Sequence, residues 1–242
     1  MPEPFLSIVI PAYNEARRIR DTLESVSRFK EGKPYAVELI VVDDGSTDQT
    51  VQTVLEFPGI RLVRNDRNHG KGYTVRHGVL EATGKLVLFT DADLSTPIEE
   101  VDKLISALQC DDADVAIGSR ALERELIGVH QPWIREMGGR FFNLLVRAFT
   151  GLNLHDTQCG FKLFNRSSTR RAFEKLRIEG FGFDPELLFL IERGGGRVVE
   201  VPVRWDDNPA TKVRFLRHSA EMFLDLIAIR WRSLTGMYSE HH

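Results

Sequence analysis

Two aspartates separated by one residue, Asp91 and Asp93, directly follow an apolar run at 86–90. Residues two apart in an extended chain point the same way, so both carboxylates can converge on one cation. Mg²⁺ and Mn²⁺ commonly combine one or two carboxylates with substrate phosphates. The pair therefore predicts a metal site for Mg²⁺ or Mn²⁺ that a nucleotide diphosphate completes. An aspartate pair in a loop also suits a helix cap or a solvated turn, so other motifs must decide.

Two earlier apolar runs, at 6–11 and 37–43, also end in polar residues. Ligands bind at the carboxyl ends of the strands in open α/β sheets. We therefore expect these ends to lie beside Asp91 and Asp93 at one edge of a sheet. The residues at the two ends are Pro11, Tyr13, Glu15, Asp43 and Asp44.

Helix-start chemistry is the alternative explanation for the same residues. Asn14 is a good N-cap, and Glu15 suits the first turn of a helix. Ser46 and Gln49 have the spacing of a capping box. Pro11 and Tyr13 are not needed for capping, which favours a ligand-binding role for the first strand end.

Strand-like runs alternate with helix-like stretches along the chain. This alternation predicts an α/β fold with a mostly parallel central sheet and helices on both faces. Without a repeat or linker, we expect one domain over 1–242, with a long mobile loop at 121–136. The expected strands lie at 6–11, 37–43, 60–64, 86–90, 113–118, 161–165 and 197–203, and the helices at 14–29, 47–57, 71–82, 98–109, 134–149, 168–176 and 184–193.

Composition narrows the class of protein. A formal net charge of −3 over 242 residues gives no electrostatic case for nucleic-acid binding. Cys110 and Cys159 lack metal-ligand spacing, which favours a reducing compartment over a disulfide framework. A strand entered by about residue 5 leaves no room for a signal peptide, and no apolar run is long enough to span a bilayer. We expect a cytoplasmic protein, at most peripheral on a membrane.

Taken in order, the motifs resemble the family 2 inverting glycosyltransferases of the GT-A fold. The first four are Pro11-Ala-Tyr-Asn-Glu15, Val42-Asp-Asp-Gly-Ser-Thr-Asp48, Asn68-His-Gly-Lys-Gly72 and Asp91-Ala-Asp93. Later motifs are similar to the polyprenyl-phosphate branch of that family, and most to its dolichyl-phosphate β-glucosyltransferases. They are Gly118-Ser-Arg120, Asp156-Thr-Gln-Cys-Gly-Phe-Lys162, Glu200-Val-Pro-Val-Arg204 and Lys212-Val.

The resemblance implies roles for a nucleotide-binding half at about 5–118. Tyr13 and Glu15 would lie around the base and ribose, and Asp43 and Asp44 would contact the uracil and ribose. Lys71 would approach the donor from a glycine-rich turn at a helix start, where anions bind readily. The complete set of implied nucleotide-sugar residues is Pro11, Tyr13, Glu15, Asp43, Asp44, Lys71, Arg76, Asp91, Ala92 and Asp93, with Asp91 and Asp93 as the metal ligands.

The resemblance also implies an acceptor-binding half at about 119–210. Asp156, Gln158 and Asp93 would be the catalytic residues. Asp156 would be a general base for a hydroxyl acceptor, or would orient a phosphate acceptor that is already charged. Acceptor phosphate would be bound by Arg120. Arg204 and Lys212 would hold either the acceptor phosphate or the donor diphosphate.

The expected activity is metal-dependent, inverting transfer of glucose from UDP-glucose to a polyprenyl phosphate. Ser95 stands where the mannosyltransferase branch often has Gln, which favours the glucosyltransferase branch. The alternatives are a GDP-mannose donor, a glycan or other hydroxyl acceptor, and a non-catalytic nucleotide-sugar-binding module.

A C-terminal amphipathic helix is predicted at about 213–235. Its apolar arc is wider than the usual core-facing stripe of about 100°. The arc suits packing on the domain, formation of a homo-oligomer, or a membrane interface with Trp231 near the headgroups.

Overall fold

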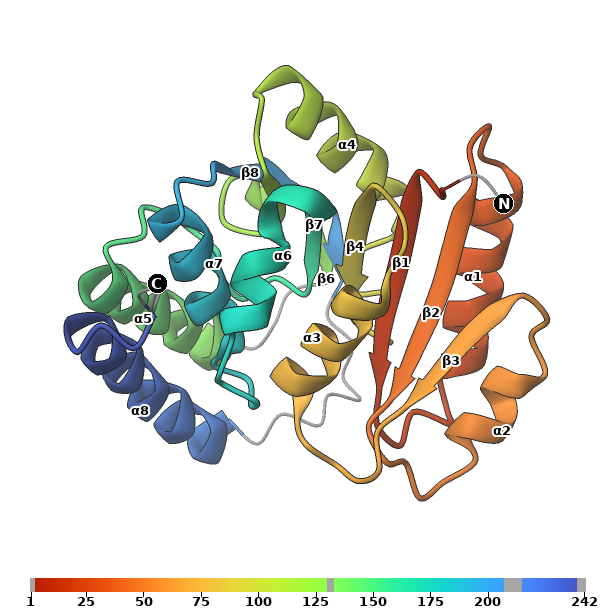
Figure 1. The fold of residues 1–242 in the computed structure, drawn as a ribbon, viewed down its shortest axis with the longest axis horizontal. Helices are drawn as coiled ribbons and strands as arrows, with labels where there is room; N and C mark the ends of the chain where they lie inside the picture. Colours follow the sequence, from red (N-terminus) through yellow and green to blue (C-terminus); the bar gives the residue numbers. More distant parts are fainter. Residues whose placement is uncertain (1–2, 130–132, 207–214, 239–242) are drawn as a thin grey trace.

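The computed structural model describes residues 3–129, 133–206 and 215–238. Its centre is a seven-stranded sheet in the order β3-β2-β1-β4-β7-β5-β8 (Figure 1). The strands are β1 (Leu6–Ala12), β2 (Val37–Asp43), β3 (Ile60–Arg64), β4 (Leu86–Thr90), β5 (Val115–Ser119), β7 (Phe161–Asn165) and β8 (Val198–Pro202). The α-helices are α1 (Ile19–Glu31), α2 (Thr50–Leu55), α3 (Lys71–Glu81), α4 (Val101–Cys110), α5 (Trp133–Thr150), α6 (Arg166–Lys175), α7 (Phe183–Arg193) and α8 (Phe215–Leu234).

The prediction of a mostly parallel α/β sheet is confirmed. The strand β7 is the exception, because it runs antiparallel between β4 and β5. The remaining pairings within this sheet are parallel.

The predicted loop at 121–136 contains more structure than expected. A short 3₁₀ turn, η2 (Arg124–Leu126), leads into β6 (Ile127–Val129), and α5 begins at Trp133. β6 pairs in parallel with β9 (Trp205–Asp206). The prediction of an irregular loop over this whole stretch was therefore wrong, since tertiary pairing with a distant segment orders its middle.

Both faces of the sheet are covered, as predicted. Alternate residues of a strand point to opposite faces. Ile8 and Ile10 belong to a core formed with α1 and α4, whereas Val9 and Phe89 belong to a second core formed with α3, α6 and α7. Strands buried on both sides become nearly continuous apolar runs, which is why they were visible in the sequence.

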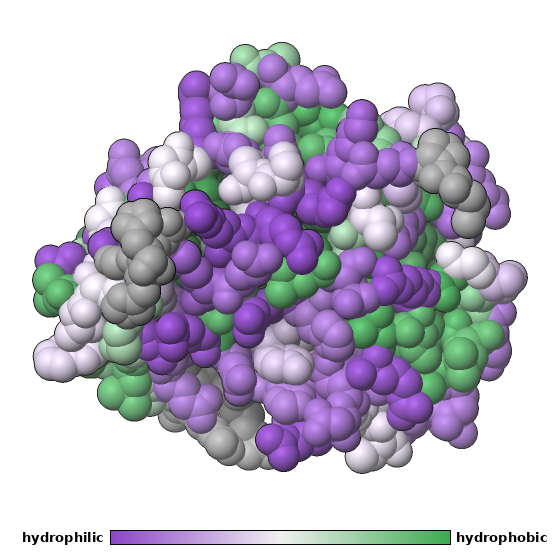
Figure 2. Space-filling model, viewed as in Figure 1, coloured by the Kyte–Doolittle hydropathy of each residue, from purple (hydrophilic) through white to green (hydrophobic). Residues whose placement is uncertain are grey.

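The predicted C-terminal helix is α8, which packs against α5 and α7. Its Leu226 and Ile229 are fully buried, but Leu224, Trp231 and Leu234 are 64%, 64% and 69% exposed. Apolar surface is visible at the left edge of Figure 2, where Figure 1 places α5 and α8. No helix in the described part of the chain is both long and apolar enough to cross a bilayer.

Candidate functional site

The carboxyl ends of β1, β2 and β4 meet at one edge of the sheet, as the sequence predicted. These three strands are adjacent and parallel in the order β2-β1-β4. Beyond their ends lies a cleft of about 390 Å³, called the donor cleft below. It is lined by Pro11, Ala12, Tyr13, Glu15, Arg18, Asp44, Asn68, Gly70, Lys71, Thr74, Asp91, Ala92, Asp93 and Phe181.

The loop carrying the two aspartates is held from both sides. From α1, the Thr22 hydroxyl donates a 2.6 Å hydrogen bond to the Ala92 carbonyl. From the segment before β7, the Gly160 carbonyl accepts a 3.1 Å bond from the Asp91 N–H. A Cβ at Gly160 would lie only 1.9 Å from Asp91 Oδ2. Glycine is therefore required here for the close approach of backbone and carboxylate.

Two cations flank the aspartates. Lys71 Nζ lies 2.7 Å from Asp91 Oδ1, and Arg18 Nη1 lies 3.6 Å from Asp93 Oδ2. Burial lowers the pKa of Lys71, but the nearby carboxylates of Asp91 and Asp184 outweigh it and raise that pKa. Lys71 therefore stays charged, and its ammonium group is fixed beside Asp91.

The aspartates suit a divalent cation. Burial, with the charge of Asp91, raises the pKa of Asp93, so a cation would relieve the repulsion between the two carboxylates. In the described ranges, no three His, Cys, Asp or Glu side chains cluster as a complete ligand set. Two hard oxygen ligands with open positions match Mg²⁺ or Mn²⁺ completed by substrate phosphates. The residues present fit the predicted metal.

Asp44 anchors the glycine-rich turn that leads into α3. Its carboxylate accepts hydrogen bonds from Asn65 Nδ2 at 2.8 Å and from the backbone N–H groups of His69 at 3.0 Å and Gly70 at 2.9 Å. Asp43 is fully buried and accepts from the Ser46 N–H at 3.2 Å. Asp44 thus holds the turn that places Lys71 in the cleft.

The polar residues after β1 do not act as a helix start, which was the alternative explanation for them. Asn14 lies in the left-handed region with φ 55°, and its side-chain oxygen accepts from the Thr47 N–H at 2.8 Å. The Ser46 hydroxyl accepts from the Asn14 N–H at 2.9 Å. The predicted capping box at Ser46 was wrong, because that hydroxyl is committed to the neighbouring loop and α2 begins only at Thr50.

Tyr13 and Glu15 both line the donor cleft. Tyr13 is 40% exposed, whereas Glu15 is buried and pairs with Arg18 through a 2.9 Å bond between Oε1 and Nη2. The sequence reasoning missed Arg18, because an arginine near a helix start looks like an ordinary surface residue. Phe181 was missed as well, since it reaches the cleft from a distant segment.

A buried ion pair behind the cleft was also missed. Lys162 is fully buried in β7, and its Nζ contacts Asp184 Oδ1 at 2.6 Å and the Cys159 carbonyl at 2.5 Å. Burial raises the pKa of Asp184 above its usual value, although the positive charges of Lys162 and Lys71 lower it in part. A lysine in the middle of an apolar strand was the available signal in the sequence. The pair fixes the position of α7 against the strand beside the aspartate loop.

On the acceptor side, Arg120 and Asp156 form a forked pair. Arg120 Nε and Nη2 donate to the two carboxylate oxygens at 2.7 and 2.9 Å, and the Arg120 N–H donates at 3.1 Å. Burial raises the pKa of Asp156, but Arg120 outweighs burial and holds that pKa below its usual value. Gln158 donates its backbone N–H to Asp156 at 3.2 Å. Asp156 is thus an ionised carboxylate with both oxygens engaged.

Two further predicted residues, Arg76 and Arg204, do not line the donor cleft. Arg76 lines a different pocket, where its Nη2 donates to the Glu174 carbonyl at 3.2 Å. Arg204 follows β8 and contacts Asp206 at 3.1 Å. Lys212 lies outside the described residues. The structure therefore does not bring Arg76 to the donor edge, because its side chain lines this other pocket instead.

Comparison with known proteins agrees with this geometry. Residues 7–173 match the family described as glycosyl transferase family 2. The chain is 37% identical to dolichyl-phosphate beta-glucosyltransferase of Saccharomyces cerevisiae, covering 99% of this chain and 78% of the relative. The human protein of that name is 33% identical, covering 98% and 78%.

The fold is similar to that of glucosyl-3-phosphoglycerate synthase from Mycobacterium tuberculosis. The structure of that enzyme with Mn²⁺, uridine diphosphate and glucosyl-3-phosphoglycerate aligns with a TM-score of 0.67 at 22% identity, covering 95% of this chain and 79% of the other. A structure of the same enzyme contains Mg²⁺ and uridine diphosphate. The chain therefore belongs to glycosyl transferase family 2 and has the GT-A fold of a hexosyltransferase.

Proposed function

We propose that the protein is a metal-dependent, inverting glucosyltransferase that moves glucose from UDP-glucose to a polyprenyl phosphate. The observation that carries the proposal is the donor cleft, where Asp91 and Asp93 lie between Lys71 and Arg18. The relatives named dolichyl-phosphate beta-glucosyltransferase support the choice of sugar and acceptor, since they match almost the whole chain.

The donor would lie across the ends of β1, β2 and β4. Tyr13, Glu15 and Asp44 would surround the base and ribose, and Pro11 and Ala92 would border them. Asp43 is fully buried and would support the loop beside them through its bond with the Ser46 N–H. Asp91 and Asp93 would hold Mg²⁺ or Mn²⁺, which neutralises diphosphate charge when bound. Lys71 and Arg18 add fixed positive charge where the leaving diphosphate gains negative charge. Such preorganised stabilisation is usually the largest catalytic contribution.

Inversion requires one displacement with the nucleophile opposite the leaving group. An acceptor phosphate oxygen forms the bond to the anomeric carbon as the bond to the UDP oxygen breaks. A phosphate monoester is already anionic at neutral pH, so no strong general base is needed. This suits Asp156, which Arg120 holds in its ionised form. In this proposal Arg120 and Asp156 position the acceptor together with Gln158, and Arg204 and Lys212 add positive charge.

An apolar surface on α5 and α8 supports a lipid acceptor. We call it the α5–α8 surface. Lipid-facing helices on peripheral proteins combine such apolar side chains with flanking arginines, here Arg140 and Arg147 of α5. The surface would rest on a membrane so that the polyprenyl chain stays in lipid during transfer. Its exposed members are Met137, Phe141, Leu144, Leu224, Trp231 and Leu234.

The test is sugar transfer from UDP-glucose or GDP-mannose to a short polyprenyl phosphate, with Mg²⁺, Mn²⁺ or chelator. We expect metal-dependent product from UDP-glucose only. Preference for GDP-mannose would overturn the choice of sugar. Donor hydrolysis without lipid product would overturn the choice of acceptor, and nucleotide binding without turnover would favour a non-catalytic binding module.

A further inference from the structure

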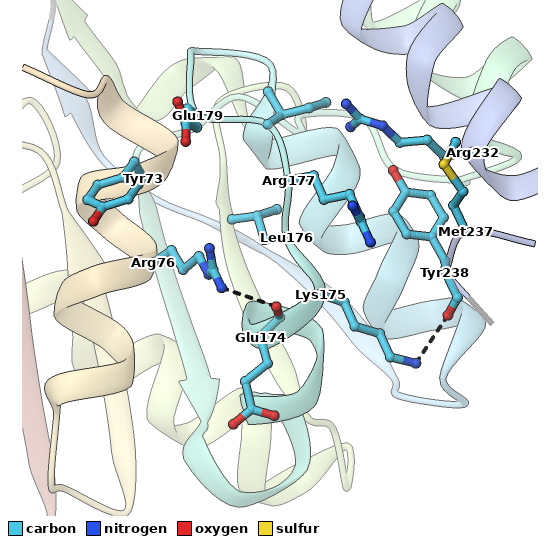
Figure 3. Close-up of a pocket in the computed structure, with 11 residues that line it drawn as sticks. Tyr73, Arg76, Glu174, Lys175, Leu176, Arg177, Glu179, Arg232, Met237 and Tyr238 are labelled. Atoms are coloured by element: carbon cyan, nitrogen blue, oxygen red, sulfur yellow. Dashed lines mark hydrogen bonds between the residues drawn. The ribbon is translucent and has the colours of Figure 1, made fainter. Parts of the chain in front are cut away.

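A second pocket, of about 820 Å³, is lined by α3, by the segment that joins α6 to α7, and by the C-terminal end of α8 with the residues that follow it. Figure 3 shows Arg76 entering it from α3, Lys175 from the end of α6, and Arg232 and Tyr238 from the C-terminal end of the described chain. Arg177 completes the positive lining. None of these residues belongs to the donor cleft, so the pocket needs an explanation of its own.

The side chains that line this pocket balance only part of the positive charge of Arg76 and Arg177. Arg76 Nε is buried and has no hydrogen-bond partner, and its Nη2 contacts only a backbone carbonyl, that of Glu174, at 3.2 Å. Within the part of the chain that the structure describes, neither Arg76 nor Arg177 forms an ion pair with a carboxylate. A buried guanidinium nitrogen without a partner costs free energy that a bound anion would recover.

The acids near the pocket are mostly committed elsewhere. The Glu174 carboxylate contacts Arg170 at 3.1 Å and points away from the pocket centre in Figure 3. Glu186 is matched by Arg232 at 3.0 Å. Of the acids that line the pocket, only the exposed Glu179 is then available to balance the charges of Arg76 and Arg177.

We propose that this pocket binds a phosphate-bearing ligand. Guanidinium groups present parallel N–H donors that match phosphate oxygens, and Arg76 and Arg177 approach from different elements. The volume exceeds that of a free phosphate ion and suits a phosphorylated small molecule or a lipid headgroup. The apolar walls at Leu176 and Met237 would contact the remainder of the ligand.

The first test is titration of inorganic pyrophosphate into the full chain by calorimetry, in chelator. The double variant Arg76→Gln/Arg177→Gln should weaken binding by about tenfold or more, as expected when two charge-assisted bonds are lost. Arg197→Gln, an exposed arginine elsewhere, should bind as the unmodified protein does. Lys71→Ala should also retain binding, which separates this pocket from the donor cleft. A thermal melt of each variant checks folding.

A second experiment distinguishes a lipid headgroup from a soluble molecule as the phosphate-bearing ligand. Vesicles of phosphatidylcholine, with and without phosphatidic acid, are sedimented with each protein. Binding that needs phosphatidic acid and falls in the double variant assigns the pocket to a lipid headgroup, whereas pyrophosphate binding alone assigns it to a soluble ligand. The proposal is overturned if neither probe binds at millimolar concentration, or if binding follows Lys71 rather than Arg76 and Arg177.

Discussion

The donor edge and the α5–α8 surface differ in the kind of side chain that forms them and in how those side chains are held. At the donor edge, short polar side chains follow parallel strands and are fixed by backbone groups, as Asp44 is by the N–H groups of His69 and Gly70. On the α5–α8 surface, large apolar side chains such as Phe141 and Trp231 are 62% and 64% exposed. The first arrangement suits one small charged ligand, and the second suits an extended apolar one.

The comparison indicates where precision is needed. In the proposed function, a carboxylate that shares a metal with the substrate would tolerate little displacement. The loop of Asp91 and Asp93 is in fact held by α1 and by the segment before β7. The α5–α8 surface, if it rests on fluid lipid as proposed, would need area rather than exact placement of its side chains. We therefore expect point substitutions to have the largest effects at the donor edge, milder effects at the Arg120–Asp156 pair and the smallest effects on α8. The following predictions test this order.

The largest effect is expected for Asp93→Ala. Removing one of two protein ligands should lower kcat by about 10³-fold or more, equivalent to about 4 kcal/mol of transition-state stabilisation. Transfer of labelled sugar measures it. Glu99→Ala, an exposed acid nearby, is the control and should keep full activity. Comparable losses in both variants would contradict a metal-binding role.

Gly160→Ala should have the next largest effect. The new Cβ would lie 1.9 Å from Asp91 Oδ2 and must displace that carboxylate. We expect about 10²-fold lower kcat, because small misplacements of reacting groups cost about that much. Gly180→Ala is a matched control, since nothing lies within 4 Å of its added Cβ. Equal activity of the two variants would show that Asp91 need not be held by this contact.

On the acceptor side, Arg120→Lys should act more mildly. Lysine keeps the charge but cannot reproduce the forked contact with Asp156 or the guanidinium stacking over Trp205. We expect about a tenfold rise in KM for the acceptor, with KM for the donor unchanged, in steady-state kinetics. Arg197→Lys serves as control. A change confined to the donor KM would place Arg120 with the nucleotide instead.

The smallest effect concerns the pH dependence of stability at α8. Burial first, and the charge of Glu186 second, raise the pKa of Asp225 to about 6, with Glu221 adding and Arg232 opposing. The unfolded value is about 3.9, so protonation favours the folded state at low pH and stability falls as pH rises from about 4 to about 6.

Asp225→Asn should remove that fall. Because Asp225 is only half-buried, solvent screening reduces the gain to about 1 kcal/mol at pH 7. Urea unfolding at pH 4 to 8 measures it, with the exposed Glu24→Gln as control. An unchanged difference between low and high pH in Asp225→Asn would refute the assignment.

Much of the donor edge could be predicted because the sequence signals that mark it lie close together in the chain. An apolar run followed by a polar tip marks a strand and its end, and parallel neighbours bring such ends together. Arg18, Phe181 and the Lys162–Asp184 pair were not predictable this way, because their roles depend on contacts between distant segments. Arg76 was predicted at the donor edge but lines the second pocket, because a position one turn after Lys71 does not fix the direction of a long side chain.

The antiparallel strand β7 also governs the order in which the molecule can be built. Its first residue, Phe161, pairs with Thr90, so Gly160 reaches Asp91 only after some 70 further residues of chain have been made. Contacts this distant form late in folding, and chains are synthesised from the N-terminus. A nascent chain ending before β7 would contain both aspartates but not the strand that aligns them. We therefore expect an isolated fragment of residues 1–118 to lack a competent donor site. Activity would then indicate that synthesis of the chain has passed β7.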